Sequence, residues 1–223
     1  MAWAEGMGPL VALAHGARPG LPLDILAGLT LLAAIPFVLV TTTSFIRIVV
    51  VLSLVRSAIG ASSLPPNAVL TAIALLLTVA VMTPTTERIE RGAIAPYVHG
   101  AISQKQMLTR AFAPLRAFML RQVHRRDLAL FARIARVDPA RGSALPAVLI
   151  PAYVVGELRS AFAIGLALYL PFVAIDLAVA SILMGLGMFM LSPPIVSLPC
   201  KLLLFVMVDG WALVCGGVVA TFR

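Results

Sequence analysis

Long apolar segments restrict the folds open to this chain more than any other sequence feature. They cover residues 21–46, 48–60, 68–83, 161–191 and 195–220. About 20 helical residues cross a bilayer core about 30 Å thick, so segment 68–83 is short for a regular span and segment 161–191 is long. Pro171 removes a backbone donor and is expected to break or kink segment 161–191, which leaves 172–191 at spanning length. The segments predict long, kinked helices that are not all simple membrane spans.

The composition agrees with an integral membrane protein. Of the 223 residues, 61% are hydrophobic and 12% are charged, whereas a soluble domain has roughly 45–50% apolar and about 25% charged residues. One soluble core cannot hide that excess, so the chain is expected to bury its surface in lipid or in an oligomer. The net charge is +8, without the interleaved aromatic residues of RNA-binding proteins. Membrane headgroups and partner subunits are therefore better partners than nucleic acid.

Composition divides the chain into four expected parts. Residues 1–20 lack a basic start, and Gly and Pro interrupt their short apolar run, so we expect a flexible leader. Residues 21–83 are expected to form N-terminal hydrophobic hairpin helices. Residues 84–160 form a basic amphipathic helical region, and residues 161–220 a C-terminal hydrophobic hairpin with a methionine-rich loop.

The basic region 84–160 holds 12 of the 17 Lys and Arg residues. Its apolar residues recur at three- and four-residue intervals, as on one face of a helix. They are Leu108, Phe112, Leu115, Phe118, Met119, Leu128, Phe131 and Ile134. The arginines would form either a solvated face over packed helices or a docking surface. The positive-inside rule by itself would place this region in the cytoplasm.

Five ionisable residues interrupt the apolar segments. They are Arg47, Arg56, Asp176, Lys201 and Asp209. Each costs about 2.5–3.5 kcal/mol at the centre of a membrane helix, so we expect them to pair with one another across helices or subunits and to support assembly. A hairpin that turns at Pro193-Pro194 would place Asp176 and Asp209 at one depth. A proton relay and a two-carboxylate protease are therefore alternatives.

No motif in the sequence indicates an enzyme, a cofactor or a metal. The three histidines are scattered, no Cys/His spacing suits zinc, and no Walker loop occurs. The remaining unusual feature is the stretch "MGLGMFMLSPP" at residues 184–194. It places Met188, Phe189 and Met190 between two glycines and two prolines, at the end of an apolar segment.

Several stretches together resemble the FliP/SctR family, the core export-gate subunit of flagellar and virulence type III secretion systems. They are "TTSFIRIVVVLSLVRSAIGASSLPPNAVLTAIALLLTVAVMTP" (42–84), "APLRAFMLRQVHRRDLALFARIA" (113–135) and a third block at 151–211. That block contains "ELRSAFAIG", "LPFVAIDLAVAS" and "SLPCKLLLFVMVDGW" in this order. The wording "FIRIVVVL" favours the flagellar branch, and the injectisome branch stays open.

The resemblance implies an all-α membrane protein of helical hairpins that assembles as a helical oligomer. Five copies would pack with FliQ/SctS-like and FliR/SctT-like subunits, beside FlhB/SctU-like and FlhA/SctV-like export components. The assembly would pass unfolded proteins across the bacterial inner membrane. The resemblance places much of the complex, including 84–160, toward the periplasm, against the positive-inside expectation.

For residues 184–194 the resemblance implies a seal. Met188, Phe189 and Met190 match a methionine-rich loop that closes the conduit, with Phe189 where many flagellar members have a third methionine. Methionine is flexible and polarizable, so a ring of such side chains could block ions yet deform around passing chains. Gly185 and Gly187 would let the backbone bend. Pro193 and Pro194 would end the helix and stiffen the turn.

Two other functions compete with a protein-conducting gate. A small-solute secondary transporter would also use irregular helices and charges within apolar segments, but the sequence shows no internal repeat. A pore-less membrane assembly scaffold would keep the packing charges and would not need the Gly/Met/Phe cluster. Without the resemblance, the methionines would be interpreted as gap-filling residues in a helix-packing core.

Overall fold

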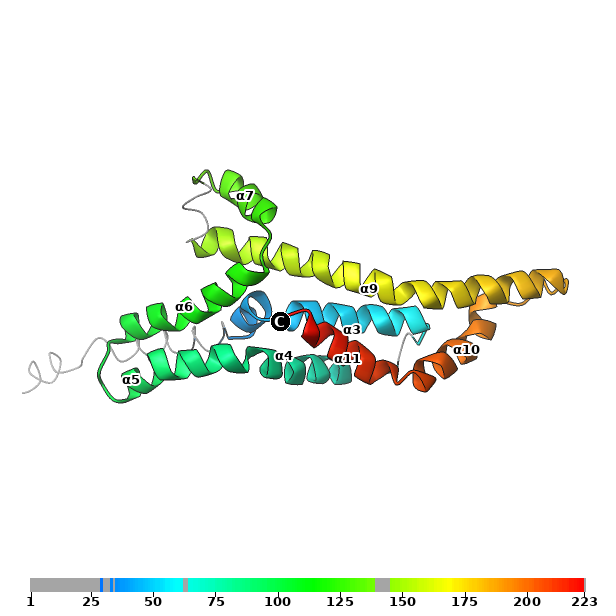
Figure 1. Ribbon diagram of the computed structural model, residues 1–223, viewed down its shortest axis with the longest axis horizontal. Helices are drawn as coiled ribbons and strands as arrows, with labels where there is room; N and C mark the ends of the chain where they lie inside the picture. Colours follow the sequence, from blue (N-terminus) through cyan, green and yellow to red (C-terminus); the bar gives the residue numbers. More distant parts are fainter. Residues whose placement is uncertain (1–28, 30–32, 34, 62–63, 139–144, 223) are drawn as a thin grey trace, which may run out of the picture. The chain divides into compact units, whose positions relative to one another are not determined.

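The structure is a computed structural model that describes residues 29, 33, 35–61, 64–138 and 145–222, and these residues form helices, turns and loops without strands. The predicted all-α fold is confirmed. The expected leader, residues 1–20, lies outside the described residues. Contacts divide the chain into a unit that ends at Val38 and a second unit from Leu39 to Arg223. The following description concerns the second unit (Figure 1).

Helices of very different length make up this unit. In chain order they are α3 (Phe45–Ile59), α4 (Asn67–Ile89), the π-helical turn η1 (Glu90–Ile94), α5 (Ala95–Val98), α6 (Gln104–Gln122), α7 (Arg125–Ile134), α9 (Pro146–Gly185), α10 (Pro193–Met207) and α11 (Gly210–Ala220).

Helix α3 forms the centre of the main hydrophobic core. It packs against α9, α4, α10 and α11, and Figure 1 shows it running alongside α9. The core residues of α3 are Ile48, Val51, Leu52, Val55, Ala58 and Ile59. A Cβ atom at Gly165 would lie 2.3 Å from Leu54 Cδ1. Glycine at this position therefore permits the close approach of α3 and α9 without displacing the Leu54 side chain.

A second hydrophobic cluster joins α4, α6 and α9. Its fully packed members are Met82, Phe118, Met119, Leu149 and Tyr153. Helix α6 begins with a capping box, in which the Ser103 hydroxyl accepts from the Gln106 amide and the Gln106 side chain accepts from the Ser103 amide. These bonds satisfy two donors at the helix start, and α6 then runs beside α4 and η1.

The predicted break at Pro171 is wrong. Helix α9 continues for 40 residues through Pro151 and Pro171. A proline removes one backbone bond, but packing holds the helix on both sides of it, and Phe172 contacts Phe205 of α10 with ring centroids 6.4 Å apart. The expected boundaries at 83/84 and 160/161 both fall inside continuous helices, because helical structure continues where the composition changes.

Several helices are long and apolar enough to cross a membrane. Asn67–Val98 and Pro146–Gly185 meet this condition singly, and two bent pairs, Ile35–Thr42 with α3 and α10 with α11, meet it together. The axes of α10 and α11 differ by 65°. The predicted membrane character is therefore supported by helix length as well as by composition.

Candidate functional site

The hairpin between α9 and α10 carries the methionine-rich loop at its tip. Helix α9 ends in a Schellman motif, in which the Gly187 amide donates to Met184 O at 3.0 Å and the Met188 amide donates to Leu183 O at 2.9 Å. This ending needs a residue in the left-handed region, and Gly187 has φ +72°. Gly185 is the last residue of α9, and its φ lies outside the left-handed region.

The three residues of the predicted seal are exposed in the protomer. Exposed fractions are 44% for Met188, 79% for Phe189 and 100% for Met190. The interpretation of these side chains as core gap-fillers therefore fails within one protomer. Pro193 and Pro194 are the first residues of α10, where the missing proline N–H groups cost nothing.

A polar cluster below the tip joins three helices. Lys201 Nζ of α10 lies 2.6 Å from Asp176 Oδ2 of α9 and donates to Ala58 O of α3 at 3.4 Å. The Ser197 hydroxyl donates to Asp176 Oδ1 at 2.5 Å. The Lys201 side chain is 8% exposed and that of Asp176 is 32% exposed. The structure thus brings together two of the five ionisable residues that the sequence singled out.

Asp176 and Asp209 do not share a depth, contrary to the expectation from the hairpin. Pro193 and Pro194 begin α10 rather than forming the turn, so the turn centre lies earlier in the chain and Asp176 faces Ser197 and Lys201. Val208 and Gly210 instead line a cavity with Leu168 and Pro171. The two carboxylates therefore do not form a shared-proton dyad.

Arg47 is the centre of a second buried cluster. Its guanidinium forms two hydrogen bonds with the Glu157 carboxylate, Nε to Oε2 at 2.9 Å and Nη2 to Oε1 at 2.6 Å. It also donates to Gln122 Oε1 and to Thr221 Oγ1, and its Cζ lies 4.0 Å from the centroid of the Phe222 ring. One side chain of α3 therefore holds α6, α9 and the segment that follows α11.

Arg47 was predicted from the sequence as a buried charge, whereas its partner Glu157 was not. The available signal was a single acidic residue in the apolar context "VVGELRSAF". A lone acid and a lone base in two apolar helices are natural partners, because each is costly to bury without the other.

The other two selected charges have no ionic partner in the described part of the chain. Arg56 donates from Nη1 to Asn67 Oδ1 at 2.6 Å and to Pro65 O at 3.2 Å. Asp209 is exposed at the bend between α10 and α11, in the left-handed region with φ 48°. Asp209 is thus not a buried charge within the protomer.

A further ion pair, not selected from the sequence, docks α7 on α9. Arg159 donates from Nη1 and Nη2 to the two Asp127 oxygens at 2.7 and 2.9 Å. The Asp127 side chain is 3% exposed. The hydrogen bonds from Arg159 lower the pKa of Asp127 despite the opposing effect of burial. The carboxylate therefore stays ionised and holds the start of α7.

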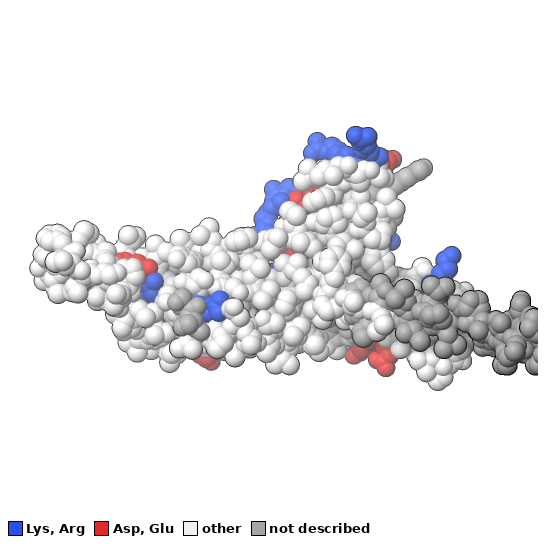
Figure 2. All heavy atoms as spheres, turned by 180° about the vertical axis from the view of Figure 1, so that it is seen from behind, with Lys and Arg blue, Asp and Glu red and all other residues white. Residues whose placement is uncertain are grey.

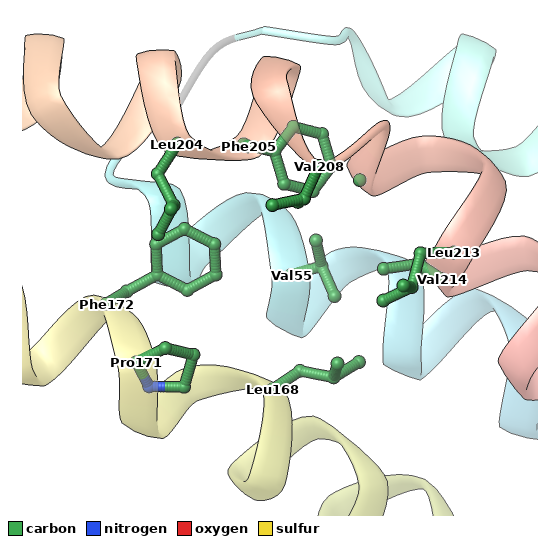
Figure 3. Close-up of a pocket in the computed structure, with 10 residues that line it drawn as sticks. Val55, Leu168, Pro171, Phe172, Leu204, Phe205, Val208, Leu213 and Val214 are labelled. Carbon is green, nitrogen blue, oxygen red and sulfur yellow. The ribbon is translucent and has the colours of Figure 1, made fainter.

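An apolar cavity of about 290 Å³ lies where α3, α9, α10 and α11 meet (Figure 3). Its lining residues include Val55, Leu168, Pro171, Phe172, Leu204, Phe205, Val208, Gly210, Leu213 and Val214. A Cβ atom at Gly210 would lie 2.3 Å from the Phe205 ring, so glycine permits the tight bend from α10 to α11.

Comparison with known proteins identifies the family. The sequence matches the FliP family over residues 28–218. The chain belongs to the FliP family. Flagellar biosynthetic protein FliP of Caulobacter vibrioides is 47% identical over 197 residues, which cover 87% of this chain and 74% of that protein. FliP of Pectobacterium carotovorum is 46% identical, over 91% of this chain and 79% of that protein. FliP of Bacillus subtilis is 42% identical, over 87% and 89% respectively.

The predicted FliP/SctR family is confirmed, and these relatives all carry the flagellar name. The predicted function is confirmed at the level of a type III export-gate component of the flagellum. The small-solute transporter gains no support from these relatives. A FliP-family chain is a structural membrane component, and the described residues contain no group of three or more His, Cys, Asp and Glu side chains that could hold a metal.

Proposed function

We propose that the chain is the core subunit of the conduit through which the flagellar type III apparatus exports unfolded proteins. In this proposal several copies surround an axial channel, and Met188, Phe189 and Met190 of each copy meet at its centre. The copies would assemble with FliQ/SctS-like and FliR/SctT-like subunits, beside FlhB/SctU-like and FlhA/SctV-like export components. It places the assembly in the bacterial inner membrane, with much of it toward the periplasm.

The exposed tip of the α9–α10 hairpin is the observation that carries this proposal. A fully exposed Met190 beside a 79% exposed Phe189 is unfavourable for a protomer alone in water. The backbone at both ends of the tip is nevertheless well defined, because the Schellman motif ends α9 before it and two prolines begin α10 after it. A fixed backbone with flexible apolar side chains suits a seal that deforms when a chain passes.

The exposed surface of α9 and α10 supports assembly with sister copies. Large apolar side chains remain exposed along both helices, among them Leu166, Leu170, Leu177, Leu203 and Val206. Packing against neighbouring subunits would cover them. We propose a pentamer of this chain and place Arg56 and Asp209 at contacts between subunits, since neither has an ionic partner in the described part of the protomer.

Replacing Met188 and Met190 with alanine tests the seal. We expect resting cells to leak small ions or dyes, because the side chains that close the channel become too short, while export of flagellar proteins continues. Met207→Ala is the matched control, since Met207 is 76% exposed on α10 outside the tip. Unchanged leakage in normally assembled complexes would refute the seal and favour a pore-less scaffold.

A further inference from the structure

The two helices of the α9–α10 hairpin are held in place very differently. Helix α9 packs against α3, α6 and α7 as well as α10. The buried residues of α10 are Ser197, Lys201 and Phe205, which lie four residues apart in one stripe. Lys201 is the only charged residue between positions 186 and 207. Figure 2 shows the hairpin almost free of charge, whereas Lys and Arg gather over the projecting part of the molecule. Helix α10 is therefore the one that can move without breaking many polar contacts.

The bend between α10 and α11 has the features of a hinge. Asp209 has φ 48°, in the left-handed region that residues other than glycine adopt uncommonly. The Phe205 ring lies directly against Gly210, where a Cβ atom would approach it to 2.3 Å. Helix α11 packs against α3 and α4 and forms the fixed side of the bend. Residues at the ends of helices commonly absorb the backbone change of a hinge movement.

Phe205 connects this bend to the neighbouring helices and has free space beside it. The centroid of its ring lies 5.2 Å from that of Trp211 and 6.4 Å from that of Phe172. Phe205 lines both the cavity of about 290 Å³ and an open groove of about 690 Å³ that α3, α4, α10 and α11 bound. Figure 3 shows Leu168 and Phe172 of α9 facing Leu204 and Phe205 of α10 across the cavity. An apolar cavity of about 150 Å³ accommodates benzene, so the cavity is large enough to receive the ring.

From these observations we propose that α10 swings about the bend at residues 208–210 when the seal at the hairpin tip opens, and that the Phe205 ring enters the cavity during this movement. The inference rests on the proposed conduit and specifies how its seal moves. The 15 residues of α10 extend about 22 Å, so a rotation of about 15° shifts their tip end by about 6 Å. Such a shift in several copies around one axis would admit a helix about 10–12 Å wide.

The other contacts of α10 are compatible with this rotation. The Lys201 ammonium is carried on a flexible four-carbon chain, so it can stay bonded to Asp176 while the helix turns. The contacts that we propose with sister copies at Leu203 and Val206 are apolar. Because apolar contacts are non-directional, they allow a small displacement of α10 against its neighbours.

A reversible cross-link between α9 and α10 tests the swing of α10. Leu168 and Leu204 line the cavity from the two helices. In the full chain with Cys200→Ser and Cys215→Ser, both leucines are changed to cysteine. A bifunctional methanethiosulfonate reagent joins the two cysteines in cells, and a reductant cleaves the link. We expect the cross-link to lower export of flagellar proteins roughly tenfold while the resting seal stays closed, because the gating movement is blocked. Reduction should restore export.

Filling the cavity provides a second test that needs no cross-link. Val214 is 4% exposed and lines the cavity, so Val214→Phe occupies the space that the Phe205 ring would enter. We expect export to fall roughly fivefold, with no leakage from resting cells and a normal yield of assembled complex. Val98→Phe is the matched control, because it is the same change at a position that is 73% exposed, and it should leave export unchanged.

The outcomes separate a wrong hinge from a wrong conduit. Normal export by the cross-linked chain, or by an assembled Val214→Phe chain, would overturn the swing of α10. Loss of export that reduction does not restore, or that single-cysteine chains treated with the reagent also show, would overturn it too. If Val214→Phe prevents assembly, the cross-link alone decides. A wrong hinge leaves the leakage of the Met188 and Met190 alanine variant intact, whereas a wrong conduit abolishes that leakage.

Discussion

Arg47 and Glu157 lie 110 positions apart in the sequence and form a bidentate ion pair at the junction of α3 and α9. Their side chains are 5% and 1% exposed. The remaining guanidinium donors bind Gln122 and Thr221, so both charges are balanced and hydrogen-bonded. The pair therefore links the helix at the centre of the core to the longest helix of the described chain.

Removing one partner of this pair should strongly destabilise the protomer. We expect Glu157→Gln to lower the free energy of unfolding by about 3–5 kcal/mol, since Arg47 then remains buried without a counter-charge. Thermal unfolding of the detergent-solubilised chain measures the loss. Glu87→Gln is the control, because its partner Arg91 is 81% exposed and such pairs contribute about 0–1 kcal/mol. A Glu157 variant as stable as the control would show that the buried pair is dispensable.

Asp176 and Asp209 should respond differently to removal of their charge. Asp176→Asn leaves the largely buried Lys201 without its carboxylate, and we expect a loss of about 1–2 kcal/mol, moderated because Asp176 is partly exposed. The yield of assembled complex should fall with it. Asp209→Asn should change protomer stability by no more than about 0.5 kcal/mol. Equal protomer stability of the two variants in unfolding experiments would contradict the role given to Lys201.

The two glycines of the hairpin tip should differ in their tolerance of a side chain. Gly187→Ala places a Cβ in the left-handed region at φ +72° and should cost about 1–2 kcal/mol. Gly185→Ala should be neutral or slightly stabilising, since no atom beyond its chain neighbours and its own helix backbone lies within 4 Å of its Cβ position and alanine favours helix. Unfolding midpoints of the two variants measure the contrast. If Gly185→Ala were the more damaging, the tip would have a different conformation in the assembly.

Docking of α7 should depend on pH through Asp127. Its pKa in the folded chain is lowered from an ordinary value of 3.8, mainly by the hydrogen bonds from Arg159. The stabilisation by the Asp127–Arg159 pair is therefore fully present above the ordinary pKa of 3.8 and is lost as the pH falls through the lowered pKa of the folded chain. Hydrogen exchange of residues 125–134, corrected for the intrinsic rate, should accelerate in this acidic range. Asp127→Asn should exchange faster at neutral pH and lose the acid dependence. The same acid response in both proteins would exclude Asp127 as its origin.

Much of the fold could be predicted from the sequence alone. Composition and the apolar segments predicted an integral membrane protein with long helices, and the family resemblance implied the all-α hairpin fold. The family followed from ordered motifs between residues 42 and 211. The bend after α9 was recognisable from Gly187, because few residues adopt its left-handed backbone conformation. The turn itself was expected at Pro193-Pro194, which instead begin α10.

Helix limits and charge partners needed the tertiary structure. A break was predicted at Pro171 because a proline removes one backbone hydrogen bond of the helix. Helix α9 nevertheless continues, and the packing of Phe172 on Phe205 helps to stabilise it. Which residue of α10 faces Asp176 depends on where the turn between α9 and α10 has its centre. The turn lies a few residues earlier in the chain than expected, so Asp176 faces Lys201 instead of Asp209.

The sequence by itself determined the class of molecule, the family and the residues that are costly to bury. Tertiary structure alone decided that Arg47 meets Glu157, that Asp176 meets Lys201 and that Asp127 meets Arg159. The physical reason is that apolarity and backbone preference are local properties of a chain. The partner of a buried charge instead depends on how helices that are distant in the sequence pack together. The apolar periodicity of each helix does not specify the register in which two helices meet.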